Sequence, residues 1–250
     1  MTQSDQSEPS GPFAPFQRRA FRWLWTGMVL ASIGFWAQTV GAQWLFINDP
    51  NAATIVSLVQ TAATLPMVLF ALAAGVLSDA FDRRRLMLYV QLYFAAVSTL
   101  LCVLTWLGAM PPLLLLALVF ANGVGSAMLV STWQPLLTEL VPRSQLAAAI
   151  RLDMVSVNVA RAIGPAIAGL VIAAWGVPPV FAINAALTLF LIVALIAWRR
   201  KPVDTGPRER FLPALRTGGR YVRHEPVVRL ILARLAVFVA PATAMWALLP

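Results

Sequence analysis

Long apolar runs separated by short gaps make up most of this sequence, and they constrain its fold more than any other feature. Each run is near the ~20 residues that an α-helix needs to cross the hydrocarbon of a bilayer. Inside such a helix the backbone amides and carbonyls satisfy one another, so the span needs no water. Sixty per cent of the residues are apolar and only 12% are charged. The core of a soluble protein cannot bury so many apolar residues. The sequence therefore predicts an all-α, multi-pass membrane protein.

Seven membrane-spanning helices are predicted from the apolar runs. The first six form two blocks of three, residues 21–107 and 111–198, which are of nearly equal length. Because each block crosses the membrane an odd number of times, the second block enters from the opposite side and forms an inverted repeat. The predicted spans cover residues 21–47, 54–77, 86–107, 113–136, 153–175, 180–198 and 230–249.

Basic residues occupy alternate gaps between the spans, and this predicts the orientation of the chain. Residues 48–53, 108–112 and 176–179 contain no Lys or Arg. Loops rich in Lys and Arg stay cytoplasmic, so we expect an inner-membrane protein with a cytoplasmic amino terminus. The same distribution argues against a nucleic-acid partner despite the net charge of +9. The basic gaps hold Arg18, Arg19 and Arg22, then Arg83, Arg84 and Arg85, then Arg143 and Arg151, and finally the basic residues of 199–229.

These spans divide the chain into four parts. Residues 1–20 are predicted to be a disordered cytoplasmic amino terminus, because they begin with a polar segment that contains proline. Residues 21–198 form the six-helix domain. Residues 199–229 form a basic cytoplasmic connector, either a plain linker or one with a short helix on the anionic leaflet. Residues 230–250 form the first helix of a second domain that is cut short.

No catalytic, cofactor or metal site is expected. The single cysteine, Cys102, lies within a span and has no companion for a disulfide or a metal site. The single histidine, His224, lies in the connector. A membrane enzyme would need a cluster of His, Asp or Glu on facing helices, and the sequence offers none that we can identify.

The sharpest local motif lies between the second and third spans. It runs from Gly75 and Asp79 to Asp82, Arg83 and Arg84. Asp79 follows the carboxyl end of a helix, where the macrodipole disfavours a negative charge by several tenths of a kcal/mol. We therefore expect Asp79 to meet the amino end of another helix or an arginine, as a latch that holds one conformation of a gate. Asp82 is predicted to be the N-cap of the third helix, and the arginines either set topology alone or also act with Asp79.

This motif resembles the signature that the major facilitator superfamily carries at the same turn. The departure is Asp82, where the general signature has glycine. An acidic residue at this position is familiar in the exporter branch that includes the enterobactin exporters, and in this respect the motif resembles that branch. The resemblance therefore implies a transporter of that branch.

A second motif lies in the fifth span and contains Arg161, Gly164, Pro165 and Gly169. It resembles the antiporter signature of exporting facilitators. Small residues every four positions, Gly164 among them, predict one smooth face for close helix packing. Pro165 crowds the carbonyl of Arg161, so a bend is expected there. Arg161 lies well inside the span, which predicts either a contact with an anion or carboxylate, or an ion pair with Asp153 or Asp79. Asp153 itself is expected to be solvated.

Polar side chains in the first, fourth, fifth and sixth spans are candidates to line a central cavity. Four of them recur at helical spacing in the first span and form a single stripe. The alternative for each side chain is that it forms a hydrogen bond to a neighbouring helix. The cavity candidates are Ser32, Trp36, Gln38, Thr39, Gln43, Asn122, Asn158 and Asn184.

The resemblance to the enterobactin-exporter-like branch extends over nearly the whole chain. The family has twelve helices in two halves with substrate bound between them, which implies that this chain is the first half plus one helix and lacks its carboxyl-terminal half. The leading hypothesis is proton-coupled efflux of a small organic molecule by alternating access, with membrane lipid, substrate and protons as partners. Phe35 is apolar where that branch often shows a small polar or acidic residue, so no proton coupling is expected there. The rival functions are a dimerising or non-transporting membrane scaffold and a polytopic membrane enzyme.

Overall fold

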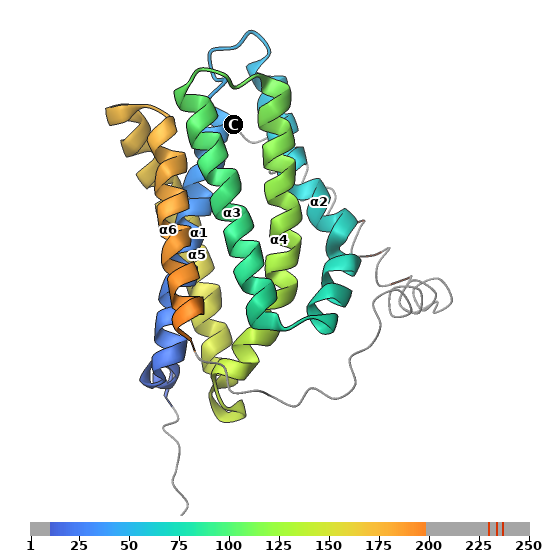
Figure 1. Cartoon of the computed structure of the whole chain (residues 1–250), viewed down its shortest axis with the longest axis vertical. Coiled ribbons are helices and arrows are strands. Elements are labelled where there is room, and N and C mark those ends of the chain that lie inside the picture. Colours follow the sequence, from blue (N-terminus) through green and yellow to red (C-terminus); the bar gives the residue numbers. More distant parts are fainter. Residues whose placement is uncertain (1–10, 199–229, 231–233, 235–236, 238–250) are drawn as a thin grey trace, which may run out of the picture.

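The computed structural model describes residues 11–198 and the isolated positions 230, 234 and 237. The described part is drawn in colour in Figure 1. Three sequence predictions fall outside it: the first half of the amino terminus, the connector at 199–229, and nearly all of the seventh span.

Six long helices make up the described part of the chain, and none of its residues lies in a strand. The fold class predicted from the sequence is thereby confirmed for these residues. The helices are α1 (Arg19–Trp44), α2 (Ala52–Ala80), α3 (Arg83–Trp106), α4 (Pro112–Leu140), α5 (Arg143–Trp175) and α6 (Pro178–Ala197), with a short 3₁₀ helix η1 (Ala14–Gln17) before α1.

One boundary differs clearly from the prediction, because α5 begins at Arg143 rather than at residue 153. Its first turns are too polar to register as a membrane span. They are nevertheless amphipathic, since Gln145, Ala148 and Ala149 are buried at helical spacing. The 33 residues of α5 extend about 50 Å, so this helix projects beyond the ~30 Å hydrocarbon.

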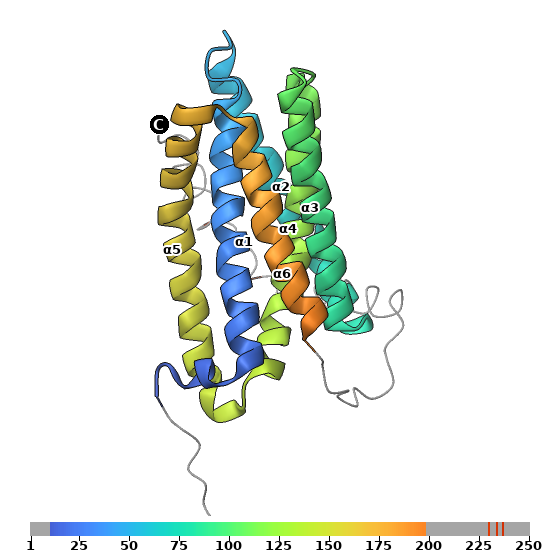
Figure 2. The same cartoon turned by 60° about the vertical axis from the view of Figure 1, so that its left-hand side comes forward.

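Five of the described helices, α2 to α6, are long and apolar enough to cross a membrane. Helix α1 is 26 residues long but is not among the helices that meet the same hydropathy criterion. It packs between α5 and α6 and runs alongside them over its length (Figure 2). The protein is therefore a multi-pass membrane protein whose first helix is sheltered by its neighbours.

The order of helix packing shows the inverted repeat. Each helix packs mainly on its neighbours in the row α5, α1, α6, α3, α4, α2. Exchanging α1 with α4, α2 with α5 and α3 with α6 leaves this set of neighbours unchanged. Figure 2 shows that α1 and α4 run in opposite directions, as an inverted repeat requires. The two blocks predicted from the sequence thus interlock, with α3 against α6 at the centre of the row.

The amino-terminal segment differs from the predicted disorder where it is described. Residues 14–17 form η1, which packs against α1 and α5. Phe16 provides the anchor, with its ring 5.5 Å from that of Phe21 and 4.9 Å from that of Trp25. Two aromatic edge-to-face contacts of this kind stabilise a short segment that composition alone marks as disordered.

Candidate functional site

The arginine-bearing ends of the helices lie together at one end of the bundle, which we call the basic end. Asp82 begins α3 there, and its Oδ1 accepts a hydrogen bond of 2.9 Å from the backbone N–H of Arg85. Asp82 is therefore the N-cap of α3, as the sequence predicts.

Arg83 joins α3 to the end of α4. Its Nη1 donates to Oε1 of Glu139 at 3.1 Å, and the two side chains are 28% and 11% exposed. Asp79, in the last turn of α2, lies at the limit of ion pairing with Arg83, at 4.0 Å, and its side chain is 77% exposed. The stronger of the two pairs is therefore with Glu139, and most of the Asp79 carboxylate remains accessible. Gly75 lies one turn earlier, and a Cβ there would meet only open space.

Arg84 joins α3 to the end of α6. Its Nε donates to the carbonyl oxygen of Leu195 at 2.8 Å and its Nη2 to that of Ile196 at 2.9 Å. These carbonyls lie in the last turn of α6, where no amide of the helix can reach them. The arginines of the motif therefore tie three helix ends together, in addition to any effect on topology.

Asp153 is buried, and this corrects the expectation that it is solvated. Only 5% of the residue is exposed. Its Oδ1 accepts from Nε1 of Trp133 at 2.9 Å and its Oδ2 from Nε2 of Gln134 at 3.3 Å, both on α4. The prediction missed this because a residue near a helix end can still be covered by a neighbouring helix. Among the described residues, neutral donors hold the carboxyl group and no arginine pairs with it.

Arg161 lies near the middle of α5, about 27 Å along the helix from Arg143 and about 21 Å from Trp175. Its guanidinium carbon is 5.0 Å from the ring centroid of Trp36 on α1, a cation–π contact. Within the described part of the chain it has no ion pair with Asp153 or Asp79. Asp153 is about 12 Å away along the same helix, and its oxygens are engaged by α4.

Gly164 lets α5 approach α1 closely beside this contact. A Cβ at this position would lie 2.6 Å from the Cβ of Trp36 and 2.9 Å from the carbonyl oxygen of Ile33. Ala160 and Ala168, four residues to either side, are fully buried. This is the smooth packing face that the sequence predicts. Helix α5 continues through Pro165, while Gly169 is exposed with open space around it.

Gln38 and Asn184 form an interhelical network. Nδ2 of Asn184 donates to Oε1 of Gln38 at 2.7 Å and to Oγ of Ser98 at 2.9 Å, so the network links α6 to α1 and α3. The backbone of Gly34 lies against Asn184, and a Cβ there would meet its Oδ1. Of the two roles predicted for Gln38 and Asn184, the structure shows the interhelical hydrogen bond.

Asn122 faces a small cavity between α1, α2 and α4. The cavity has a volume of about 20 Å³ and is lined by Asn122, Gln38 and Thr39 among mainly apolar side chains. Asn122 is 5% exposed, and neither its Oδ1 nor its Nδ2 has a hydrogen-bond partner among the described residues. A space of this size holds one water molecule or one small polar group.

The remaining cavity candidates are less enclosed. Ser32 and Gln43 are half-buried on the stripe of α1. The hydroxyl of Thr39 donates to the carbonyl of Phe35 on its own helix at 3.0 Å. Asn158 is exposed and donates to the carbonyl of Met154 at 2.8 Å. Of the predicted set, Trp36 contacts the exposed cationic Arg161 near the middle of α5, and Asn122 is a buried amide without a hydrogen-bond partner among the described residues.

Several residues of these sites were missed by the sequence analysis. Glu139 could have been predicted as a partner of the arginines, because it is the only acidic residue between Asp82 and Asp153. Trp133, Gln134 and Ser98 carry none, since their roles depend on which helix lies opposite. No group of three or more His, Cys, Asp or Glu that could hold a metal occurs in the described residues.

Comparison with known proteins identifies the family of this chain. The profile of the family described as transmembrane secretion effector matches residues 10–250. The chain belongs to this family. It is a family of the major facilitator superfamily, as the motifs at Gly75 and Gly164 indicate.

The chain is also similar to proteins whose curated names describe transporters. The staphyloferrin A transporter of Staphylococcus aureus is 26% identical over 175 residues, which cover 70% of this chain and 44% of that protein. The macrolide efflux protein A of Streptococcus pyogenes is 23% identical over 164 residues, covering 66% of this chain and 40% of that protein. An uncharacterized transporter of the superfamily in Bacillus subtilis is 23% identical over 211 residues, covering 82% and 49%. The chain thus spans less than half the length of the relatives it matches.

Proposed function

We propose that the chain forms the amino-terminal half, and one helix of the second half, of a secondary transporter that exports a small organic molecule. In this proposal transport proceeds by alternating access and is coupled to protons. The protein lies in the inner membrane with its basic end in the cytoplasm, an orientation supported by the arginines of α1, α3 and α5 at that end. The carboxyl-terminal half completes the substrate path.

The observation that carries the proposal is Arg161, which is exposed near the middle of α5 and has no ion pair among the described residues. An arginine at the centre of a membrane helix costs about 2.5–3.5 kcal/mol on insertion scales. The contact with Trp36 returns about 0.5–2 kcal/mol. Stability alone therefore does not account for Arg161, whereas a bound anion or carboxylate of the substrate would complete its hydrogen bonds. We infer that the guanidinium and the face of Trp36 contact the exported molecule.

Asp153 is the proposed proton site. In the part of the chain that the structure describes, its buried carboxyl group is held by Trp133 and Gln134 rather than by a cation. A buried carboxylate is costly to keep charged, so small changes in its surroundings shift the balance between binding and releasing a proton. Movement of α5 against α4 would change those surroundings, which links proton binding to the conformational cycle.

Asp79 is the proposed latch of the gate. Its carboxylate is largely accessible because Arg83 engages Glu139 more closely. It is therefore available to a helix end or arginine of the carboxyl-terminal half in one conformation only. This is the role that the resemblance to the superfamily motif implies.

Export from cells that express the complete gene tests the assignment. Staphyloferrin A and a macrolide, the compounds in the names of the relatives, serve as probes. Arg161→Ala is expected to abolish export of the transported probe and Arg161→Lys to retain part of it. Arg151→Ala is the matched control, since Arg151 is exposed on the same helix at the basic end. Protein abundance in the membrane is measured for each variant. Wild-type export by Arg161→Ala at normal abundance would remove Arg161 from the site.

The coupling and the latch are tested in the same assay. Asp153→Asn is expected to abolish export driven by a proton gradient while leaving counterflow of the probe intact. Asp79→Asn is expected to reduce both, because it acts on the gate. If Asp153→Asn responds to the proton gradient as the wild type does, the coupling residue lies elsewhere.

A further inference from the structure

A groove opens on the outer face of the bundle between α1 and α6, at the basic end. It has a volume of about 510 Å³, within the range of ligand sites in proteins. Leu24 and Ala194 form its buried floor, and Val193 is 65% exposed at its rim. Trp23 stacks on Phe190 with ring centroids 5.9 Å apart, which forms one wall. None of these residues belongs to the sites described above.

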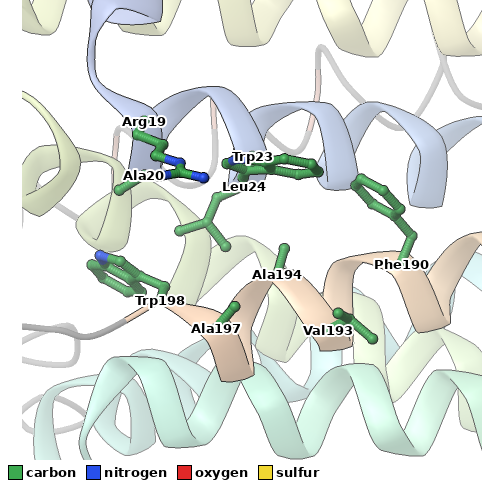
Figure 3. A pocket seen from close by; sticks show the side chains of 9 residues that line it. All are labelled: Arg19, Ala20, Trp23, Leu24, Phe190, Val193, Ala194, Ala197 and Trp198. Carbon is green, nitrogen blue, oxygen red and sulfur yellow. The ribbon is translucent and has the colours of Figure 1, made fainter.

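The groove is polar at one end and apolar at the other. Figure 3 shows Arg19 and Trp198 together at one end, and Phe190 and Val193 at the opposite end. Arg19 is the first residue of α1 and Trp198 directly follows α6, so the polar end lies at the edge of the membrane. Moving from Arg19 to Trp23, or from Trp198 to Phe190, leads toward the middle of the bilayer. The gradient of polarity thus runs in the direction of a lipid molecule.

The charge at the polar end is positive. Arg19 is exposed and has no ion pair with any described residue. Arg22 is exposed one turn further along α1. The indole N–H of Trp198 adds a neutral donor. Basic pockets between membrane helices at this depth suit a phosphate head group.

We propose that this groove binds an anionic phospholipid. The head-group phosphate lies against Arg19 and the indole of Trp198, and one acyl chain lies along Leu24, Ala194, Phe190 and Val193. The stretch from Trp198 to Phe190 spans about 12 Å along α6, enough for the upper part of an acyl chain. The bound lipid would cover the apolar side chains of the groove and join the ends of α1 and α6.

Native mass spectrometry of the purified chain, released from micelles that contain defined lipid, tests the site. Dioleoyl phosphatidylglycerol is the anionic probe and dioleoyl phosphatidylcholine the zwitterionic one. We expect one tightly retained phosphatidylglycerol per chain and at least fivefold weaker retention of phosphatidylcholine. Arg19→Gln is expected to weaken phosphatidylglycerol about fivefold, the factor to which ~1 kcal/mol per basic residue corresponds.

Matched variants separate charge from shape. Arg22→Gln removes an equal charge from a residue that does not line the groove, so we expect a smaller effect than that of Arg19→Gln. Ala197→Phe fills the groove and is expected to displace the lipid. Ala96→Phe makes the same substitution at an exposed position of α3 and is expected to retain it. Helical content by circular dichroism confirms that each variant is folded.

Cross-linking from the groove identifies its occupant directly. A photoreactive benzoylphenylalanine at position 193 is expected to capture the lipid in native membranes. Cross-links to residues 199–229, to a second copy or to the carboxyl-terminal half would overturn the proposal, because each would show a protein occupant. Equal retention of both lipids, or unchanged retention in Arg19→Gln and Ala197→Phe, would overturn it as well.

Discussion

Gly164→Ala and Gly169→Ala are expected to shift the stability of the bundle in opposite directions. Both glycines lie in α5, little more than one turn apart. A Cβ at position 164 would lie 2.6 Å from the Cβ of Trp36, 2.9 Å from the carbonyl oxygen of Ile33 and 3.1 Å from the amide nitrogen of Ala37. Two of these contacts are with backbone atoms, so no side chain can turn away to make room. At position 169 a Cβ meets open space.

The magnitude follows from two opposing effects. Alanine in place of glycine inside a helix contributes about 1 kcal/mol to the free energy of unfolding. Forcing an extra methyl group into a close-packed contact costs about 1–3 kcal/mol. Gly169→Ala is therefore expected to gain up to about 1 kcal/mol, and Gly164→Ala to lose up to about 2 kcal/mol. Both variants gain the same helix propensity from alanine. The difference between their free energies of unfolding therefore measures the α1–α5 contact alone.

Thermal unfolding of the purified chain in detergent, followed by tryptophan fluorescence, measures this difference. About 2 kcal/mol between the variants corresponds to about 4–8 °C in Tm for a chain of this size. Circular dichroism checks that both variants remain helical. Equal shifts of the two variants, in either direction, would refute the close approach of α5 to α1 and with it the placement of Arg161 over Trp36.

Two further predictions concern residues whose roles the structure separates. Asp82→Ala is expected to lower the free energy of unfolding by about 1 kcal/mol, whereas Asp82→Asn stays near the wild type because asparagine caps as well as aspartate; an equal loss in both variants would show that the charge, not the cap, matters. Asn184→Leu is expected to cost about 1–2 kcal/mol, since it removes the hydrogen bonds to Gln38 and Ser98, for which membrane proteins average about 0.6 kcal/mol each, and leaves Gln38 without its donor. Asn158→Leu, on an exposed side chain, is the control, and chemical denaturation that ranks the two variants equally would contradict the network.

The helices could be predicted from the sequence because their signal is local. An apolar run of about twenty residues specifies a span without reference to any other part of the chain. The start of α5 was missed because its signal is a stripe of buried residues, not a run. The contacts of Phe16 with Phe21 and Trp25 were missed because two aromatic residues in a polar segment give no periodic pattern.

The candidate site could be predicted only as a set of residue types. An arginine in mid-span and a Gly-Pro pair indicate a special position, and Arg161 and Gly164 were found in this way. Their partners depend on which helices become neighbours, which the sequence of one chain does not specify. The contact of Arg161 with Trp36, the pair of Arg83 with Glu139 and the burial of Asp153 all cross between helices. Each therefore required the packing order of the bundle.

The side of the membrane that each end of the bundle faces tests the proposed membrane topology most directly. In a Cys102→Ala background, single cysteines replace Phe81 at the basic end and Ala109 at the opposite end, both exposed in turns. Intact cells are treated with a membrane-impermeant maleimide, before and after permeabilisation. We expect Ala109→Cys to react in intact cells and Phe81→Cys only after permeabilisation. Reaction of Phe81→Cys in intact cells would contradict the proposed orientation, and reaction of both variants there would contradict the placement of the two ends on opposite sides of the membrane.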